Sequence, residues 1–254
     1  MFDPTPMYHR IYVVLHDQIQ RGYFDPDQPM PSEVELARTF SVSRVTLRKT
    51  LERLEREGLI LRQRGRGTFA RPRRVASPVQ ADVSGLVENL LIMGVTTKVK
   101  VIEFDYVETP SDVARDMGFD EGTLAQYAVR VRSYKKQPFS YSQTYVREDI
   151  GRSFTAKDMA KTPLLRLFER AGVKIGGANQ KISARAADAV VADHLGVNIG
   201  SPLLCIKRIV KDENDRTVEW INALYHPDMY EFEMNLSLRQ GPNGTVWQPS
   251  QSSL

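Results

Sequence analysis

The chain has 254 residues, a net charge of +4, 41% hydrophobic residues and 26% charged residues, which is ordinary for a globular protein long enough for two domains. Its only cysteine, Cys205, excludes an intrachain disulfide and cysteine-rich zinc sites. No apolar run of about 18 residues is present, which excludes a membrane-spanning helix, and Met1–Pro6 lacks the pattern of a signal peptide. We therefore expect a cytoplasmic protein without membrane partners.

Positive charge is concentrated in one short part of the chain. Residues 41–74 hold 11 Lys/Arg against 3 Asp/Glu. Such a concentration is expected of a surface that contacts nucleic-acid phosphates. A solvated, charged helix surface accounts for the same count equally well, so the charge needs support from the local pattern.

Two helices are predicted before this basic stretch. Apolar residues recur at three- and four-residue spacing over 7–21, and Gly22 ends that helix. A proline-rich connection follows. Ser32 then opens the second helix, because Glu35 three residues later completes a capping-box pattern.

A third helix begins after a short turn, with Ser43 as its cap. Its leucines recur at spacings that face a core: Leu47, Leu51 and Leu54. Arg44 and Arg48 are four residues apart on a different face. A helix with an apolar back and a basic edge is typical of the recognition helix of a helix-turn-helix, which lies in the DNA major groove.

Two short strands, 59–64 and 68–70, are predicted next, joined by Gly65-Arg-Gly67. A plain hairpin with an exposed arginine fits this segment alone. After an arginine-faced helix, we interpret it as a DNA-binding wing whose tip presents Arg66. The predicted winged helix-turn-helix domain is 1–71, and the basic, proline-containing segment 72–79 is the predicted linker.

The predicted second domain, 80–240, contains an internal repeat. The layout of 111–130 recurs at 188–208, with Gly118, Gly122 and Arg130 each matched 78 residues later. Each unit reads as a strand, a short helix and a β-hairpin, after a first helix at 83–93. Two such units predict an α+β fold: one antiparallel sheet with helices on one side. The Gly-, Pro- and Ser-rich segment 241–254 is predicted to be a disordered tail.

The strand 124–134 carries the clearest candidate ligand site. Arg130, Arg132 and Tyr134 share one face, because side chains alternate along a strand. Adjacent guanidinium groups are well suited to bind a carboxylate or phosphate, although a solvated face with acidic neighbours would fit as well. Further polar strand residues are candidates: Ser142, Thr144, Glu219 and Tyr225.

No metal site or cofactor is predicted, because His9, His16, His194 and His226 lack the spacing of metal ligands. No phosphate-binding glycine loop, nucleophile motif or paired catalytic carboxylates are present either, so we do not expect an enzyme.

The sequence resembles the GntR family of bacterial repressors, in its HutC-type subfamily, over about residues 8–239. The DNA-binding part carries Pro31-Ser-Glu-Val-Glu-Leu-Ala37, Val42-Ser-Arg-Val-Thr-Leu-Arg48, Leu54-Glu-Arg-Glu-Gly-Leu-Ile60 and Arg64-Gly-Arg-Gly-Thr-Phe69. The second part resembles the UTRA effector domain, which shares its fold with chorismate lyase. That match rests on Ala186-Ala-Asp-Ala189, Leu195-Gly-Val197, Gly200-Ser-Pro-Leu-Leu204, Thr217-Val-Glu-Trp220, Tyr225 and Phe232.

The resemblance implies a homodimer on a palindromic operator of double-stranded DNA, controlled by a small metabolite. The expected DNA-binding residues are Ser32, Glu33, Ser43, Arg44, Thr46, Arg48, Arg64, Arg66, Gly67 and Thr68. The expected effector-binding residues are Ser84, Arg130, Arg132, Tyr134, Ser142, Thr144, Glu219 and Tyr225, of which Ser84 and the roles of Glu219 and Tyr225 come from the resemblance.

Two positions depart from the family pattern. Val34 stands where relatives usually have an arginine that contacts DNA, so we expect a different operator preference. Ser142 stands where a glutamate is common, which argues against recognition of sugar hydroxyls and leaves an anionic ligand. A lyase-like enzyme and a non-specific DNA-binding protein are the alternative hypotheses.

Overall fold

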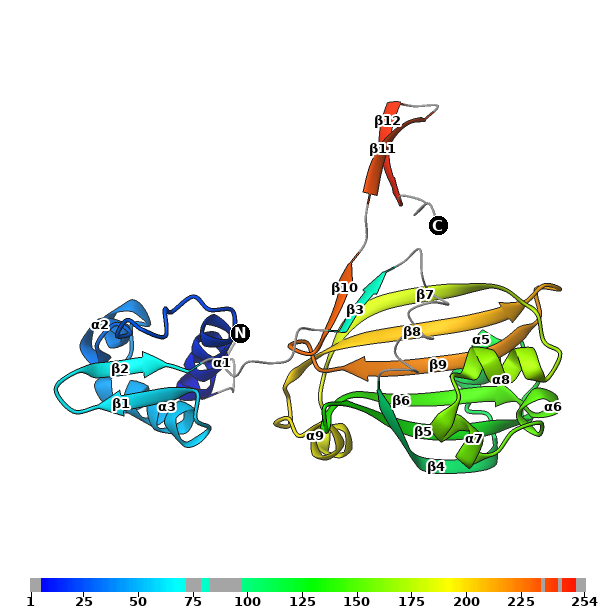
Figure 1. The fold of residues 1–254 in the computed structure, drawn as a ribbon, viewed down its shortest axis with the longest axis horizontal. Coiled ribbons are helices and arrows are strands. Elements are labelled where there is room, and N and C mark those ends of the chain that lie inside the picture. Colours follow the sequence, from blue (N-terminus) through cyan, green and yellow to red (C-terminus); the bar gives the residue numbers. More distant parts are fainter. Residues whose placement is uncertain (1–5, 72–78, 83–96, 234–235, 242–243, 250–254) are drawn as a thin grey trace. The chain divides into compact units, whose positions relative to one another are not determined.

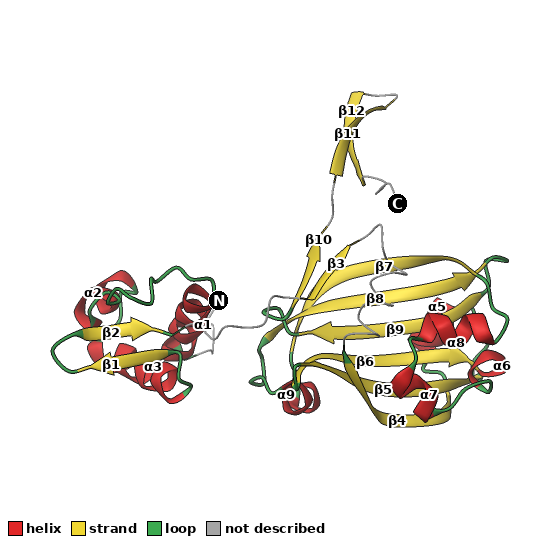
Figure 2. Ribbon diagram, viewed as in Figure 1, coloured by secondary structure: helices red, strands yellow, loops and turns green. Residues whose placement is uncertain are grey.

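The computed structural model describes residues 6–71, 79–82, 97–233, 236–241 and 244–249 (Figures 1 and 2). The chain divides into two compact units, 1–76 and 77–254. The first unit covers residues 1–71, predicted as the DNA-binding domain, together with residues 72–76 of the predicted linker.

The described residues of the N-terminal unit form three helices and one hairpin: α1 (Met7–Gln20), α2 (Glu33–Thr39), α3 (Arg44–Arg56), β1 (Ile60–Gln63) and β2 (Gly67–Ala70). The leucines predicted to face the core of α3 are almost fully buried, together with Leu15 and Ile19 of α1. Burying each such side chain stabilises the fold by about 1.5–3 kcal/mol. These contacts fix α3 against α1 and leave the other face of α3 outside the core.

Both predicted helix caps are present. The backbone N–H of Glu35 donates to Ser32 Oγ at 3.3 Å, and the backbone N–H of Ser32 donates to Glu35 Oε2 at 2.8 Å. At the start of α3, the backbone N–H of Thr46 donates to Ser43 Oγ at 3.2 Å. The caps therefore set where both helices of the helix-turn-helix begin.

The C-terminal unit is built on a six-stranded antiparallel sheet in the order β4-β5-β6-β9-β8-β7. Its strands are β4 (Lys98–Glu108), β5 (Leu124–Tyr134), β6 (Gln137–Arg147), β7 (Ile175–Ala186), β8 (Pro202–Asp212) and β9 (Thr217–Tyr225). The first repeat unit supplies β4, β5 and β6, and the second supplies β7, β8 and β9. The two sets run in mirrored order outward from the β6–β9 seam, as two equivalent units side by side require. The predicted α+β class is confirmed.

Helices cover both faces of this sheet, so the expectation of helices on one side is wrong. α5 (Ser111–Met117) and α9 (Ala189–Leu195) pack on one face, and α6 (Glu148–Gly151), α7 (Ala156–Lys161) and α8 (Leu164–Arg170) pack on the other (Figure 2). The central strands carry apolar residues on both faces, each of which needs cover. No helix in the described residues is long and apolar enough to cross a membrane.

The internal repeat is visible in the backbone. Gly118 and Gly196 end α5 and α9 with the same left-handed φ of 67°. Each helix packs on the strand of the other unit that lies at the β6–β9 seam, α5 on β9 and α9 on β6. Trp220 Nε1 of β9 donates to Asp116 of α5 at 3.0 Å, while Tyr141 of β6 stacks on His194 of α9 with ring centroids 5.6 Å apart.

Two predicted boundaries are wrong. Val79 belongs not to the linker but to β3 (Val79–Asp82), which pairs in parallel with β10 (Tyr230–Glu233). The predicted disordered tail contains β12 (Gly244–Pro249), which pairs with β11 (Leu236–Gly241). Glycine, proline and asparagine favour turns as well as disorder, and here they separate two paired strands. The predicted helix 83–93 and the linker residues 72–78 lie outside the described residues.

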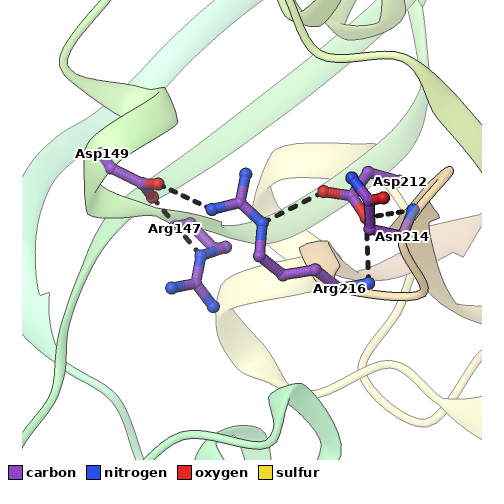
Figure 3. A network of polar contacts seen from close by, with 5 residues as sticks. All are labelled: Arg147, Asp149, Asp212, Asn214 and Arg216. Atoms are coloured by element: carbon purple, nitrogen blue, oxygen red, sulfur yellow. Dashed lines mark hydrogen bonds and ion pairs between the residues drawn. The ribbon is translucent and has the colours of Figure 1, made fainter.

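A polar network ties α6 to the turn between β8 and β9 (Figure 3). The Arg216 guanidinium donates to Asp149 Oδ2 and to Asp212 Oδ2, both at 3.0 Å. Asp212 Oδ1 also accepts from the backbone N–H groups of Asn214 and Arg216. Burial opposes ionisation of Asp212, but these hydrogen bonds prevail and lower the pKa of its carboxyl.

We predict that Asp212 makes the C-terminal unit sensitive to acid. Because the folded-state pKa is lowered, its stabilisation is fully present above the unfolded pKa of about 3.9 and is lost as pH falls through the folded value. Asp212→Asn should lower the Tm at neutral pH and flatten the loss of Tm below about pH 5. Asp215→Asn is the control, because Asp215 lies in the same turn but its side chain is 83% exposed. Equal pH profiles for the wild type and Asp212→Asn would contradict this role.

Candidate DNA-binding and effector sites

The start of α3 presents the predicted reading residues. Arg44 is exposed, and Thr46 is half-buried beside the cap, where its Oγ1 lies 2.9 Å from Ser43 Oγ. Ser43 and Thr46 therefore hold each other in place, next to an arginine that is free to meet a base edge. Val45, between Arg44 and Thr46, is 67% exposed.

Glu33 positions one of the predicted reading arginines. Its carboxylate lies 3.8 Å from Arg48 Nε and 3.3 Å from Arg62 Nη2, and Arg62 also faces Glu55 at 3.6 Å. Exposed pairs of this kind contribute little stability. These ion pairs instead orient the Arg48 side chain, since the chain of charges joins α2, α3 and β1 around it. Ser32 is engaged as the cap of α2, so its DNA contact stays a prediction.

The hairpin tip has the geometry predicted for a wing. Arg64, Arg66 and Gly67 are exposed, and Thr68 is half-buried. The carbonyl of Thr68 accepts from the backbone N–H of Met30 at 2.7 Å, which ties the wing to the proline-rich connection. The Arg66 guanidinium lies 5.9 Å from the Phe69 ring centroid. The wing arginines are therefore presented from an anchored hairpin.

In the C-terminal unit, the sheet brings most of the predicted effector residues onto one face. We call the face that bears Arg130 and Arg132 the arginine face. The register places Arg130 opposite Ser142, and Arg132 opposite Ser140, which in turn pairs with Tyr225. Arg130 is only 5% exposed, and within the described residues its Nε has no hydrogen-bond partner. Burial and the neighbouring Arg132 lower the pKa of Arg130 to about 10.

Arg132 is half-buried, and its Nη1 donates to Thr97 Oγ1 at 3.2 Å. Burial lowers the pKa of its guanidinium, opposed by the nearby Tyr225 hydroxyl. The charge of Arg132 thus disfavours the charged form of its neighbour Arg130. Two guanidinium groups side by side are suited to contact a carboxylate or a phosphate.

The hydroxyl residues of β6 are engaged by the sheet itself. Ser142 Oγ donates to the carbonyl of Arg130 at 3.5 Å, and Thr144 Oγ1 donates to that of Ala128 at 3.3 Å. Tyr134 lies at the turn end of β5, where it pairs with Gln137 and where Lys135 Nζ is 5.2 Å from its ring. Ser142 is therefore beside Arg130, whereas Tyr134 lies at the turn. Ser84 lies outside the described residues.

Glu219 is 5% exposed and lies on the arginine face, in β9. Burial raises the pKa of its carboxyl, and Arg130 and Arg208 act in the opposite direction. Arg208 is the residue that our site prediction omitted. It is 9% exposed, and its Nε and Nη2 donate to Gln180 Oε1 at 2.9 and 2.6 Å. The 78-residue repeat matches Arg208 to Arg130, and this match was the sequence signal that could have identified Arg208 as a site residue.

Comparisons with known proteins agree with this architecture. Residues 7–70 match the model of bacterial regulatory proteins of the gntR family, and residues 93–231 match the UTRA domain. The chain belongs to the GntR family. This GntR-family chain is a transcriptional regulator with a UTRA domain, rather than an enzyme, and the HutC-type resemblance is confirmed.

The chain aligns with transcriptional regulators over most of their length. The HTH-type transcriptional repressor NagR of Bacillus subtilis is 28% identical, over 90% of this chain and 94% of its own. The regulator GmuR of the same organism is 30% identical, over 77% and 83%. The crystal structure of the possible transcriptional regulator YydK from Bacillus subtilis matches 91% of this chain and 99% of its own with a TM-score of 0.56 and 23% identity.

Solved structures of isolated effector domains match as well. The ligand-binding domain of a putative GntR-family regulator from Bordetella bronchiseptica is 28% identical, with a TM-score of 0.53 over 56% of this chain and 89% of its own.

Among the described residues, no group of three or more His, Cys, Asp and Glu side chains could hold a metal ion.

The wing yields a prediction about Gly67. Its φ of 110° is a conformation that other residues rarely adopt, and a Cβ there would lie 3.1 Å from Pro29 Cβ. Gly67→Ala should destabilise the N-terminal unit by about 1–3 kcal/mol and weaken DNA binding, as measured by thermal unfolding and gel shift.

Gly65→Ala is the matched control for this test. Its φ is 75°, and a Cβ there would have nothing within 4 Å. It should therefore cost less than Gly67→Ala. Equal losses from the two variants would mean that the contact with Pro29 does not constrain the wing.

Proposed function

We propose that this regulator is a repressor that binds a palindromic operator as a homodimer and responds to a small anionic metabolite on the arginine face. The observation that carries the effector assignment is the adjacent pair Arg130 and Arg132, held on a buried sheet face with the Arg130 Nε unpartnered among the described residues. The named repressors among its relatives support the direction of control.

The DNA contacts that we propose follow from charge and exposure. Arg44 and Arg48 on α3 are suited to bidentate hydrogen bonds with guanine in the major groove, and Arg64 and Arg66 of the wing to phosphate or minor-groove contacts. Val34 offers a half-buried apolar side chain at the position where relatives have an arginine. We therefore expect an operator preference different from theirs.

The effector couples to DNA binding only if it binds the two arrangements of the dimer with different affinity. An anion between Arg130 and Arg132 relieves their repulsion, and it favours whichever arrangement of the dimer binds it more tightly. Release of the operator on binding is the outcome that we propose, in a cytoplasmic protein that acts directly on DNA.

The reading role of Arg44 predicts a change in base preference. Arg44→Ala should weaken binding to the operator in the protein's own upstream region by about 1–3 kcal/mol and relax the preference at one base position. Gel shifts on the wild-type operator and on single-base variants measure both effects. An equal loss on every sequence would instead identify Arg44 as a phosphate contact.

The effector role predicts that response and DNA binding separate. The double variant Arg130→Ala/Arg132→Ala should bind the operator with wild-type affinity but no longer respond to the inducing acid or phosphate. A thermal-shift screen of carboxylic acids, phosphates and sugar phosphates identifies that inducer first. Arg185→Ala is the control, because Arg185 is an exposed arginine in the same unit, on β7. A double variant that still responds would rule out this anion site.

A further inference from the structure

The exposed face of α3, a helix that the structure describes throughout, carries a single apolar side chain. Its exposed residues are all charged except Val45: Arg44, Val45, Arg48, Lys49, Glu52, Glu55 and Arg56. Val45 is 67% exposed, so it takes no part in the core of the N-terminal unit. Single apolar residues are common on protein surfaces, and exposure alone therefore does not indicate a contact. The place of Val45 within the helix is more informative.

A valine at this place does not stabilise the helix. Its branched Cβ restricts the side chain, and valine favours a helix less than alanine, arginine or lysine does. Because Val45 is exposed, it also gains little from burial in the folded protein. An alanine would make the N-terminal unit at least as stable, so the packing of this unit does not account for Val45.

Val45 lies among the groups that α3 offers to DNA. Arg44 precedes it, and Arg48 and Lys49 follow at the spacings of three and four residues that make side chains neighbours on a helix surface. The carboxylate of Glu33 lies 3.8 Å from Arg48 Nε and holds that arginine at this edge. When these cations contact phosphates and base edges, Val45 is brought into the same interface.

The hydroxyl groups near Val45 are engaged within the protein. Thr46 Oγ1 lies 2.9 Å from Ser43 Oγ, which also caps the helix. Thr50 Oγ1 donates to the carbonyl of Tyr8 at 2.9 Å, and this hydrogen bond fixes the back of α3 against α1. Val45 therefore extends from a helical turn whose position is set by the fold, as recognition of one base at a fixed place requires.

We propose that Val45 is a specificity-determining residue that reads a thymine through its 5-methyl group. This methyl group is the apolar group that base pairs present in the major groove. Contact with the valine removes both groups from water, whereas a polar base edge would lose hydrogen bonds to water without replacement. Because α3 must lie in the major groove for this contact, the role of Val45 rests on the proposed function. A palindromic operator would carry one such thymine in each half-site.

Deoxyuridine, which lacks only the methyl group of thymidine, tests this role in the full-length protein. In duplexes of the operator from the protein's own upstream region, each thymine is replaced in turn. Fluorescence anisotropy should show that wild-type binding weakens about fourfold at one thymine per half-site, the loss expected for one buried methyl group. Val45→Ala should bind the thymine and uracil duplexes equally at that position, with a Tm equal to or above that of the wild type.

Val14→Ala is the matched control, because Val14 is an exposed valine that belongs to a different helix, α1. It should leave the preference for the methyl group intact. A wild type that binds every uracil duplex as tightly as the thymine duplex, or a preference that Val45→Ala retains, would overturn the role of Val45. If the wild type does not distinguish the operator from unrelated DNA, or if Arg44→Ala leaves binding unchanged, the reading role of α3 in the proposed function fails instead.

Discussion

Guanidinium groups buried on a hydrogen-bonded sheet are the feature on which the C-terminal unit depends. Arg130 and Arg132 repel each other, and burial lowers the pKa of both. The sheet can hold them because the backbone, not the side chains, fixes their separation: β5 is hydrogen-bonded on both sides, by β4 and β6. Rigid strands thereby keep these two charges side by side, which is the arrangement that the proposed anionic effector would relieve.

The N-terminal unit was predictable in detail because its structure is determined locally. The capping pairs, the leucine spacing of α3 and the glycines of the wing each act within a few residues. The same is true of the helix ends at Gly118 and Gly196. The sequence did not reveal that Glu33 pairs with Arg48 and Arg62, because these contacts depend on how two helices and a strand pack.

The C-terminal unit was predictable in class but not in its edges. β3 pairs with β10 across about 150 residues, and no local pattern encodes such a partner. Gly176 and Gly177 disfavour a strand, yet pairing with β8 extends β7 back to Ile175. The capping box at Thr155 and Asp158, by contrast, is a local sequence pattern that marks the start of α7. For the site, alternation along β5 identified the arginine pair, but only the register across β6 and β9 brought Glu219 and Arg208 onto the same face.

The exchange of helices between the two repeat units has a consequence for how the domain can exist. α5 covers a strand of the second unit and α9 covers a strand of the first, through Asp116 with Trp220 and Tyr141 with His194. Each helix therefore joins the two units, since α5 and α9 each cover a strand of the other unit. In this respect the domain resembles a dimer within one chain. Its axis of approximate symmetry passes through the β6–β9 seam. The buried residues Arg130 and Arg208 lie on opposite sides of this axis.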